Sequence, residues 1–382
     1  MKDQLKTIAN ALKPDLCQIS DFMYHHPELG NREYQAVQKL TAFLTQNGFA
    51  VTSPVLDMDT AFVAVYDTGR PGPSVAFICE YDALPEIGHA CGHNMIGAMS
   101  AGAGVMLSKM AESAGNLSGK IYVFGTPAEE TNGGKVAMAD AGLFNGITAA
   151  MMLHPSSITQ ESGASAAMEA LQFSYKGLTA HAAGCPEKGI NALNAVIQLF
   201  NGTDALRQHV TPDVRIHGII SKGGVAANIV PDEAAAQFYI RAATKETLAT
   251  VKEKVLNIAQ GAALMTGATL DVSNYELSYD DLKTNPALSD AFNKNLRSLG
   301  ITDIEPAKRG AGSSDIGNVS NVIPTIHPSI AICKTPLAGH TREFADATIT
   351  DFAHDRLLIG ALALACTGLD VLTGEIAPRQ NT

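Results

Sequence analysis

The sequence lacks the features that would place the protein in a membrane, in a secretory route or on nucleic acid. Its 382 residues contain no run of about 18 apolar residues, so we expect no membrane-spanning helix. The N-terminal segment MKDQLKTIANALKPDL has no apolar centre of the kind found in signal peptides, so the cytoplasm is the expected compartment. Acidic residues outnumber basic ones by 38 to 27, and the net charge of −11 disfavours a nucleic-acid partner.

The sequence also lacks the dense cysteine framework of a small disulfide-linked protein. Six cysteines are spread through a long chain, at positions 17, 79, 91, 185, 333 and 366, and we expect reduced thiols. The apolar fraction of 46% with 17% charged residues is typical of a compact globular protein. A chain of this length exceeds one ordinary hydrophobic core, so we expect two domains.

The first part of the chain alternates apolar runs with helix-like segments. Residues 74–85, 119–130 and 147–155 form continuous apolar runs, which are typical of strands buried on both faces. Residues 94–115, between the first two runs, are rich in small residues and predict a helix packed closely on a sheet. This alternation predicts an α/β domain with a mostly parallel sheet flanked by helices, in which ligands bind at the carboxyl ends of the strands.

The pattern changes near Ala170, where strand, turn and helix signals follow one another twice. Two units of this kind suggest a small α+β domain inserted into the first one. After it, residues 285–300 restart a helical pattern, and an amphipathic helix closes the chain. The predicted organisation is a discontinuous domain at 1–169 and 281–382, interrupted by an insert at 170–280.

The segment GHACGHN, residues 88–94, places Cys91 and His93 two positions apart in a glycine-containing loop. A thiolate and an imidazole at this spacing can bind a soft or borderline metal ion. The same two residues could be a nucleophile with its base, or a buried thiol beside a packed histidine. The segment by itself leaves these interpretations open.

Two adjacent carboxylates, Glu129 and Glu130, follow the second apolar run in the segment PAEE. They repel each other unless a positive group lies close, and a metal ion would supply it. One carboxylate could then bind metal while the other acts as a general base; a solvated pair in a loop is the alternative.

Two histidines, His154 in MMLHP and His340 in PLAGHTREF, each follow an apolar run. Singly, each is more typical of a packed histidine than of a ligand. Jointly, one set of residues at the edge of one sheet becomes a plausible ligand set for one or two divalent metals: Cys91, His93, Glu130, His154 and His340.

Eight segments occur together in the order found in one known family: HPELGNRE, CEYDALPEIGHACGHN, GTPAEE, MMLHP, GLTAHAAGCPEKGINAL, GGVAANIVPDEA, GSSDIGNVSNVIPTIHP and GHTREF. Together they resemble peptidase family M20, subfamily D, which contains metal-dependent amidohydrolases, aminoacylases and dipeptidases. Within it the chain is similar to the branch of the p-aminobenzoyl-glutamate hydrolases and the β-alanyl-lysine dipeptidases. The resemblance implies cleavage of the amide bond in N-acyl or N-aminoacyl amino acids by a metal-activated water.

The resemblance also implies roles for individual residues. Two divalent ions, zinc or manganese, would be held by the five residues of the ligand set, with Cys91 bridging them. Glu129 would be the general base. Asp82 would orient one of the ligands without binding metal itself.

In the insert, which would be the lid and dimerisation domain of a homodimer, His181 would polarise the scissile carbonyl. Asn228 and Arg241 would hold the substrate's carboxylate or groups near it. Whether His181 acts on the site of its own protomer or on that of the partner is left open.

One segment departs from the family pattern. Much of the subfamily has CGHDxH, whereas this chain has CGHNMIG, so Asn94 and Ile96 supply no metal ligand. Two other interpretations remain: a cysteine hydrolase with Cys91 as nucleophile, and a non-catalytic metal- or ligand-binding protein. Asp315 is a further candidate for lining a substrate pocket, and Arg309 could meet an anionic substrate.

Overall fold

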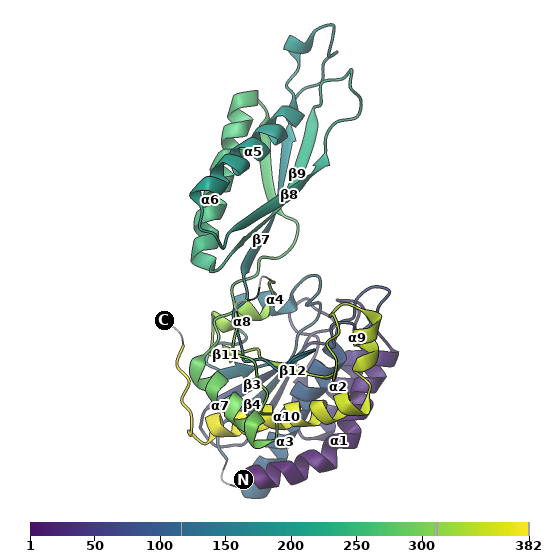
Figure 1. The fold of residues 1–382 in the computed structure, drawn as a ribbon, viewed down its shortest axis with the longest axis vertical. Coiled ribbons are helices and arrows are strands. Elements are labelled where there is room, and N and C mark those ends of the chain that lie inside the picture. The colour runs from purple at the N-terminus through teal and green to yellow at the C-terminus, as the bar shows by residue number, and fades with distance from the viewer. Residues whose placement is uncertain (116, 309, 311, 381–382) are drawn as a thin grey trace. The chain divides into compact units, whose positions relative to one another are not determined.

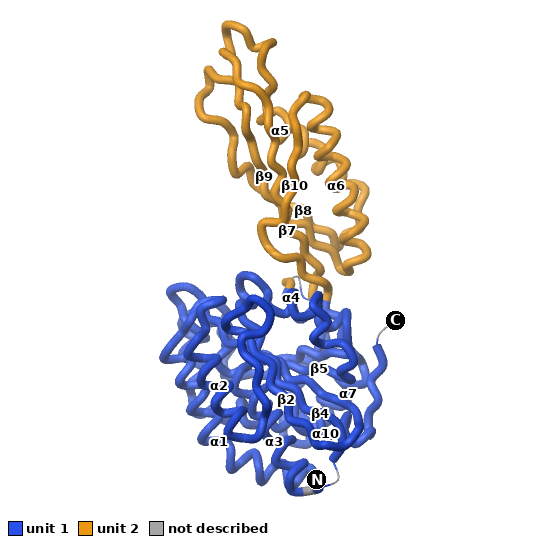
Figure 2. The backbone as a smooth tube through the Cα atoms, turned by 180° about the vertical axis from the view of Figure 1, so that it is seen from behind, with its two compact units in different colours: residues 1–164, 282–310, 314–382 blue, residues 165–281, 311–313 orange. Residues whose placement is uncertain are grey.

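The computed structural model describes residues 1–115, 117–308, 310 and 312–380 (Figure 1). The chain divides into two compact units (Figure 2). Unit 1 comprises Met1–Ala164, Leu282–Gly310 and Ser314–Thr382, and unit 2 comprises Ser165–Asp281 with residues 311–313. The predicted insert, 170–280, lies inside unit 2.

Unit 1 contains helices and strands that alternate along the chain. Its first part has α1 (Lys2–His25), α2 (Tyr34–Gln46), β1 (Ala50–Thr52), β2 (Phe62–Asp67), β3 (Ser74–Cys79), α3 (His93–Ala114), β4 (Lys120–Gly125), α4 (Gly134–Asp140), β5 (Ala149–Met151) and β6 (His154–Ser156). Its second part has α7 (Pro286–Ser298), α8 (Ile316–Ser320), β11 (Thr325–Ile326), β12 (Ser329–Ala331), α9 (Arg342–Ala347) and α10 (Asp351–Leu372). Among the described residues, no helix combines the length and apolarity needed to cross a membrane.

The main sheet of unit 1 has the strand order β1-β2-β4-β3-β5-β11. Strands β4, β3, β5 and β11 are parallel, and β1 and β2 add an antiparallel edge. Alternate residues of β3 enter different cores: Val75 and Phe77 pack with α1, α3 and α10, while Ala76 and Ile78 pack with residues of α4 and α8. Because helices cover both faces, the strands are continuously apolar, and the predicted α/β class with a mostly parallel sheet is confirmed.

The parallel register brings the chemistry-bearing loops to one edge of this sheet. Cys79 at the end of β3 pairs with Gly125 at the end of β4, and Phe77 pairs with Met151 at the end of β5. The segments that follow these ends carry Asp82, Glu129–Glu130 and His154. Three loops separated in sequence therefore leave the sheet together.

Unit 2 has a four-stranded antiparallel sheet in the order β10-β7-β9-β8. Its elements are β7 (Ala167–Lys176), η1 (Pro186–Lys188), α5 (Ala192–Leu206), η2 (Arg207–His209), β8 (Arg215–Lys222), β9 (Glu233–Ala242), α6 (Lys245–Thr266) and β10 (Thr269–Asn274). Every second residue of β9 is buried, and these residues pack with α5 and α6. The alternation is that of a sheet with helices on one face, so the predicted α+β insert is confirmed.

Candidate metal centre

Asp82 is a buried carboxylate that holds two candidate ligands at once. His93 Nδ1–H donates to Asp82 Oδ1 at 2.8 Å, and the backbone N–H of Glu130 donates to Asp82 Oδ2 at 3.0 Å. Since the first bond occupies Nδ1, the Nε2 of a neutral His93 ring is left to bind a metal. Despite the effect of burial, the charge and hydrogen bond of His93 lower the pKa of Asp82, which stays ionised.

Gly92 sets the separation between Cys91 and His93. Its φ of +82° lies in the left-handed region, and a side chain there would bring Cβ within 2.4 Å of Pro155 Cγ. Glycine is therefore required for this turn to approach the strand that begins at His154. His93 is the first residue of α3, so the helix fixes its backbone.

Glu33 stabilises the loop that carries Glu129 and Glu130 through a hydrogen bond to its backbone. Glu33 Oε1 accepts a hydrogen bond from Ala128 N–H at 2.8 Å, and Glu33 Oε2 accepts one from the Thr60 hydroxyl at 2.7 Å. Ala128 has φ +60°, an uncommon conformation for a residue with a side chain. Backbone strain of this kind clusters at functional sites, and Glu33 contributes to maintaining it here.

His154 and His340 complete the group from two other segments. His154 Nδ1–H donates to Pro155 O at 2.7 Å, which leaves Nε2 facing Cys91 Sγ at 3.5 Å. His340 also has φ +60°, and its backbone N–H donates to Ala90 O at 2.9 Å. Its Nε2 lies 3.4 Å from Glu130 Oε1.

The structure thus brings the five sequence-predicted ligands together, and we call them the ligand cluster. Their ligand atoms form two groups, each within 4.8 Å, that share one thiol: Cys91 with His93 and His154, and Cys91 with Glu130 and His340. His93 Nε2 and Glu130 Oε1 are buried with no hydrogen-bond partner among the described residues. Buried polar atoms normally have partners, so this nitrogen, oxygen and sulfur donor set fits divalent metal ions.

The charges in the ligand cluster argue against a nucleophilic cysteine. Burial raises the pKa of the Cys91 thiol to about 12, although His93 acts in the opposite direction. Nucleophilic cysteines have a lowered pKa, so this environment does not favour the cysteine hydrolase interpretation. Burial opposes the charged form of His93, but the charge and the hydrogen bond of Asp82 outweigh it and raise the pKa of His93 well above its usual value.

A second group of ionisable residues lies beside the ligand cluster, and we call it the lysine cluster. Lys135 is fully buried, and its Nζ lies 2.6 Å from Glu80 Oε1 and 2.6 Å from Asp315 Oδ1. Glu80 Oε2 in turn lies 3.5 Å from His93 Nε2, and carboxylate oxygens of Glu80, Asp315 and Glu129 fall within 4.8 Å of one another. The predicted general base therefore lies beside one buried ammonium and two further carboxylates.

One lysine does not compensate three carboxylates equally. Burial alone would raise the pKa of Glu80, but Lys135 and His93 lower it to about 2. Burial raises the pKa of Asp315, and burial together with the negative charge of Glu80 raises the pKa of Glu129 well above its usual value. A carboxyl group with a raised pKa is suited to exchange protons near neutral pH.

Sequence reasoning missed Glu80 and Lys135, and it assigned Asp315 to the wall of a pocket. Asp315 is instead fully buried and paired with Lys135. Glu80 carried one usable signal, since it stands two residues before Asp82 at the end of an apolar run, on the same side of an extended chain. Lys135 carried no such signal in the sequence, because a lysine after two glycines is usually exposed. Arg309 lies outside the described residues.

The remaining sequence-predicted residues belong to unit 2. The segments of His181 and Asn228 lie side by side, since Ala182 N–H donates to Asn228 O at 3.0 Å. His181 Nδ1 accepts hydrogen bonds from the backbone N–H groups of Ala183 and Gly184, so a neutral ring carries its proton on Nε2. Both His181 and Asn228 are exposed.

Arg241 lies on β9, where it donates to the Ser313 hydroxyl at 2.7 Å and stacks over the Tyr239 ring.

Asn94, where this chain departs from the family pattern, lies buried in unit 1. Its side-chain amide donates hydrogen bonds to the hydroxyls of Ser20 and Thr348. Asn94 therefore joins α3 to two other segments, which is a structural role.

Three comparisons show which known proteins this chain is similar to. Residues 156–264 match the peptidase dimerisation domain of the M20 family. The Xaa-Arg dipeptidase of Mus musculus is 37% identical over 369 residues, which cover 93% of this chain and 85% of that protein. One chain of the p-aminobenzoyl-glutamate hydrolase of Escherichia coli is 30% identical over 325 residues, 79% of this chain and 67% of that one. A dinuclear metal-binding M20 peptidase of Bacillus subtilis shares the fold, with a TM-score of 0.71 at 20% identity over 95% of this chain and 99% of that chain.

Proposed function

Because this chain belongs to the M20 peptidase family, it is a hydrolase of amide or peptide bonds, and we propose that it cleaves N-acyl or N-aminoacyl amino acids with two divalent metal ions bound at the ligand cluster. One observation carries the proposal: two triads of ligand atoms share the Cys91 sulfur, and two of their buried atoms have no hydrogen-bond partner among the described residues. Divalent ions there would polarise the scissile carbonyl. They would also lower the pKa of a water molecule, which could then lose a proton and attack the carbonyl carbon.

Glu129 is the proposed general base. It lies in one group with His93 and Glu130, within 4.8 Å, and its raised pKa suits a carboxylate that takes a proton and returns it. In this scheme Glu129 removes a proton from the attacking water. It then delivers the proton to the leaving nitrogen as the carbon–nitrogen bond breaks.

We assign substrate contacts to unit 2. His181 carries its proton on Nε2 when neutral, so it can donate a hydrogen bond to the carbonyl oxygen as negative charge develops there. Arg241 and Asn228 would hold the carboxylate of the amino-acid half of the substrate or groups near it, because a guanidinium pairs well with a carboxylate. The names of the two relatives, a dipeptidase and an aminobenzoyl-glutamate hydrolase, support a substrate with an amino acid on the leaving side.

The test of the reaction is Glu129→Gln. We expect turnover of dipeptides and acyl-amino acids to fall by about 10²- to 10⁴-fold, the usual contribution of a general base. Metal content, measured by elemental analysis, should stay at the wild-type level, since the five ligands remain. Unchanged turnover would remove Glu129 from the mechanism, and a metal-loaded wild type inert toward the whole substrate panel would refute the proposed hydrolysis.

Zinc and manganese are both proposed occupants. The thiolate and three imidazoles favour zinc, whereas the carboxylate suits manganese as well. Restoring the metal-stripped protein separately with zinc, manganese and cobalt, and measuring the same substrate panel, identifies the metal that supports the highest kcat/KM.

We propose a homodimer formed through unit 2, which contains most of the matched dimerisation domain. Strand β8 is an edge strand, and Ile219 and Ile220 on it are 62% and 47% exposed. An exposed apolar edge strand is a template for pairing with a second chain. Ile219→Lys should convert the dimer to a monomer in light scattering, while the matched change Ile197→Lys on helix α5 should not. A dimer that survives Ile219→Lys would place the interface elsewhere.

The cytoplasm remains the proposed compartment, with small molecules rather than nucleic acid as partners. Six free cysteines suit a reducing environment, and the net charge of −11 suits small substrates better than a polyanion.

A further inference from the structure

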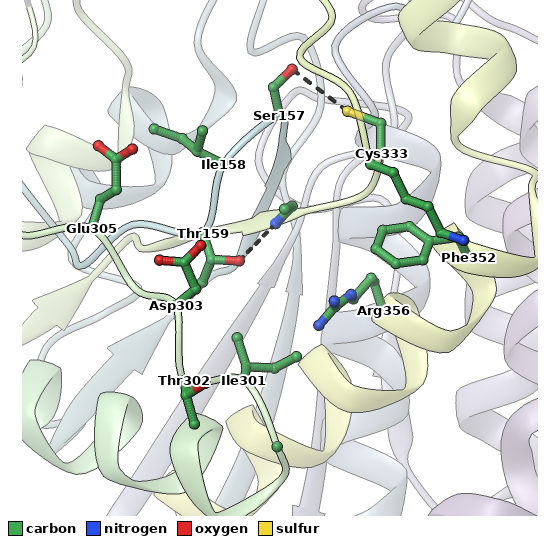
Figure 3. Close-up of a pocket in the computed structure, with 13 residues that line it drawn as sticks. Ser157, Ile158, Thr159, Ile301, Thr302, Asp303, Glu305, Cys333, Phe352 and Arg356 are labelled. Atoms are coloured by element: carbon green, nitrogen blue, oxygen red, sulfur yellow. Dashed lines mark hydrogen bonds between the residues drawn. The ribbon is translucent and has the colours of Figure 1, made fainter.

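A cavity of about 300 Å³ lies in unit 1, and no residue of the ligand cluster lines it. Its walls come from residues 157–159 after β6, residues 300–305 after α7, the end of β12 and the first turns of α10 (Figure 3). A volume of this size is at the small end of the range for small-molecule sites. The cavity would therefore accept a compact ligand of a few heavy atoms.

Two cations meet at one aromatic ring on one wall of this cavity. The Arg356 guanidinium carbon lies 4.7 Å from the centre of the Phe352 ring, and Lys334 Nζ lies 5.6 Å from it. Among the described residues neither cationic group has a hydrogen bond or an ion pair, although the charge of Asp355 acts on Arg356. Burial also lowers the pKa of the half-buried Arg356, which indicates that its charge is incompletely solvated.

Carboxylates lie across the cavity from Arg356. Figure 3 shows Asp303 and Glu305 on the side opposite Arg356 and Phe352. Glu305 forms an ion pair with Lys308, whereas Asp303 has no ion-pair partner among the described residues. The cavity therefore presents Arg356 and Asp303 on opposite walls, and neither forms an ion pair among the described residues.

We propose that this cavity binds a free α-amino acid, with its carboxylate at Arg356 and its ammonium at Asp303. An α-amino acid carries both charges on one small frame, so it compensates both walls at once. A simple anion would compensate only one wall. The site accepts a ligand of the class that the proposed hydrolysis releases.

Two short segments connect this cavity to the ligand cluster. His154 begins β6, and Ser157 of the cavity wall follows it by three residues, about 10 Å of extended chain. Ser157 Oγ accepts a hydrogen bond from Leu337 N–H at 2.9 Å, and Leu337 precedes His340 by three residues. A bound amino acid can thus bias the positions of two metal ligands, which would make the site regulatory; this regulatory step, unlike binding, rests on the proposed function.

The test measures binding of L-alanine to the metal-loaded protein by calorimetry, with acetate and methylamine as probes that carry only one of the two charges. We expect Arg356→Met and Asp303→Asn each to weaken L-alanine binding by about tenfold or more, because each removes one charged hydrogen bond. The matched control Arg70→Met, at an exposed arginine of the same unit, should bind as the wild type does. Acetate or methylamine should bind far more weakly than L-alanine.

The outcomes separate this site from the proposed reaction. Binding that ignores both variants, or acetate that binds as well as L-alanine, would refute the amino-acid site. If no substrate is hydrolysed while binding still depends on Arg356 and Asp303, the proposed function fails and the site stands. Asp303 is exposed, so Asp303→Asn decides the question even if Arg356→Met does not fold. Added L-alanine should change the hydrolysis rate of the wild type but not that of Asp303→Asn; an equal response in both would refute the regulatory step.

Discussion

The ligand cluster and the lysine cluster lie side by side in unit 1 and are built from similar side chains, but they treat charge in opposite ways. In the lysine cluster, the Lys135 ammonium lies 2.6 Å from two carboxylate oxygens, so much of the buried negative charge has an internal partner. In the ligand cluster, His93 Nε2 and Glu130 Oε1 are buried with no hydrogen-bond partner among the described residues. The lysine cluster thus contains its own cation, whereas the ligand cluster contains donor atoms that no group in the described part of the chain satisfies.

We therefore expect the lysine cluster to stabilise the fold and the ligand cluster to bind a ligand. A buried ion pair is costly to break, because the remaining charge has no solvent to stabilise it. An open set of buried donors lowers the stability of the folded chain until a ligand binds, so binding and stability are coupled there. Removing Lys135 should therefore act on stability, whereas changes in the ligand cluster should act through metal.

The largest expected effect is that of Lys135→Met. The substitution keeps most of the apolar side chain but leaves Glu80 and Asp315 without their cation, and we expect a loss of about 3–5 kcal/mol in the free energy of unfolding. Urea denaturation followed by circular dichroism measures it. The control is Lys120→Met, at an exposed pair with Asp67, where the loss should be far smaller because water already solvates both charges. Equal losses of unfolding free energy in Lys135→Met and Lys120→Met would contradict the stabilising role of the lysine cluster.

The next effect is that of metal removal. Metal at about 100 times its dissociation constant should stabilise the wild type by about 2.7 kcal/mol relative to the chelated protein. Thermal unfolding with zinc or manganese and with a chelator measures the difference. Cys91→Ala removes the sulfur shared by both triads, so its unfolding should no longer respond to metal. A response that persists in Cys91→Ala would place the metal elsewhere.

A smaller effect is expected for Asp82→Asn. The amide cannot accept hydrogen bonds from both His93 Nδ1–H and Glu130 N–H with the strength of a carboxylate, so the ligands lose their fixed orientation. We expect metal affinity to fall by about 10- to 100-fold, measured by competition with a chromophoric chelator. Asp67→Asn, at an exposed carboxylate, is the matched control and should leave the affinity unchanged. An Asp82→Asn protein with wild-type affinity would mean that Asp82 does not position the ligands.

The smallest effect is a change in the acid sensitivity of stability below pH 4.5. The pKa of Glu80 is lowered from 4.5 to about 2 in the fold, so its stabilising contribution is present above pH 4.5 and is lost as the pH falls toward 2. Without Lys135 this pKa rises, and Glu80 becomes neutral at higher pH. The stability difference between wild type and Lys135→Met should therefore shrink as the pH is lowered from 4.5 to 2 in urea titrations. A difference that grows in this range would contradict the assignment.

The sequence predicted the ligand cluster well because its members follow strand ends that meet at one edge of a parallel sheet. Cys91, His93, Glu130, His154 and His340 carry donor atoms that are rare in such numbers beside apolar runs, so their joint presence was informative. The lysine cluster was not predictable in the same way. Lys135 and Asp315 are 180 residues apart, and their pairing depends on the contact of α4 with α8.

The α/β class, the α+β insert and the residue types of the ligand cluster were predictable from the sequence, because periodicity and donor chemistry are local properties of the chain. Which of the charges are compensated was not predictable, because this depends on tertiary contacts. Compensation depends on distances of a few ångströms between segments far apart in the chain, and on how completely water is excluded around them. For that reason Asp315 proved to be the partner of a buried lysine, and a cavity beside Arg356 became visible only in three dimensions.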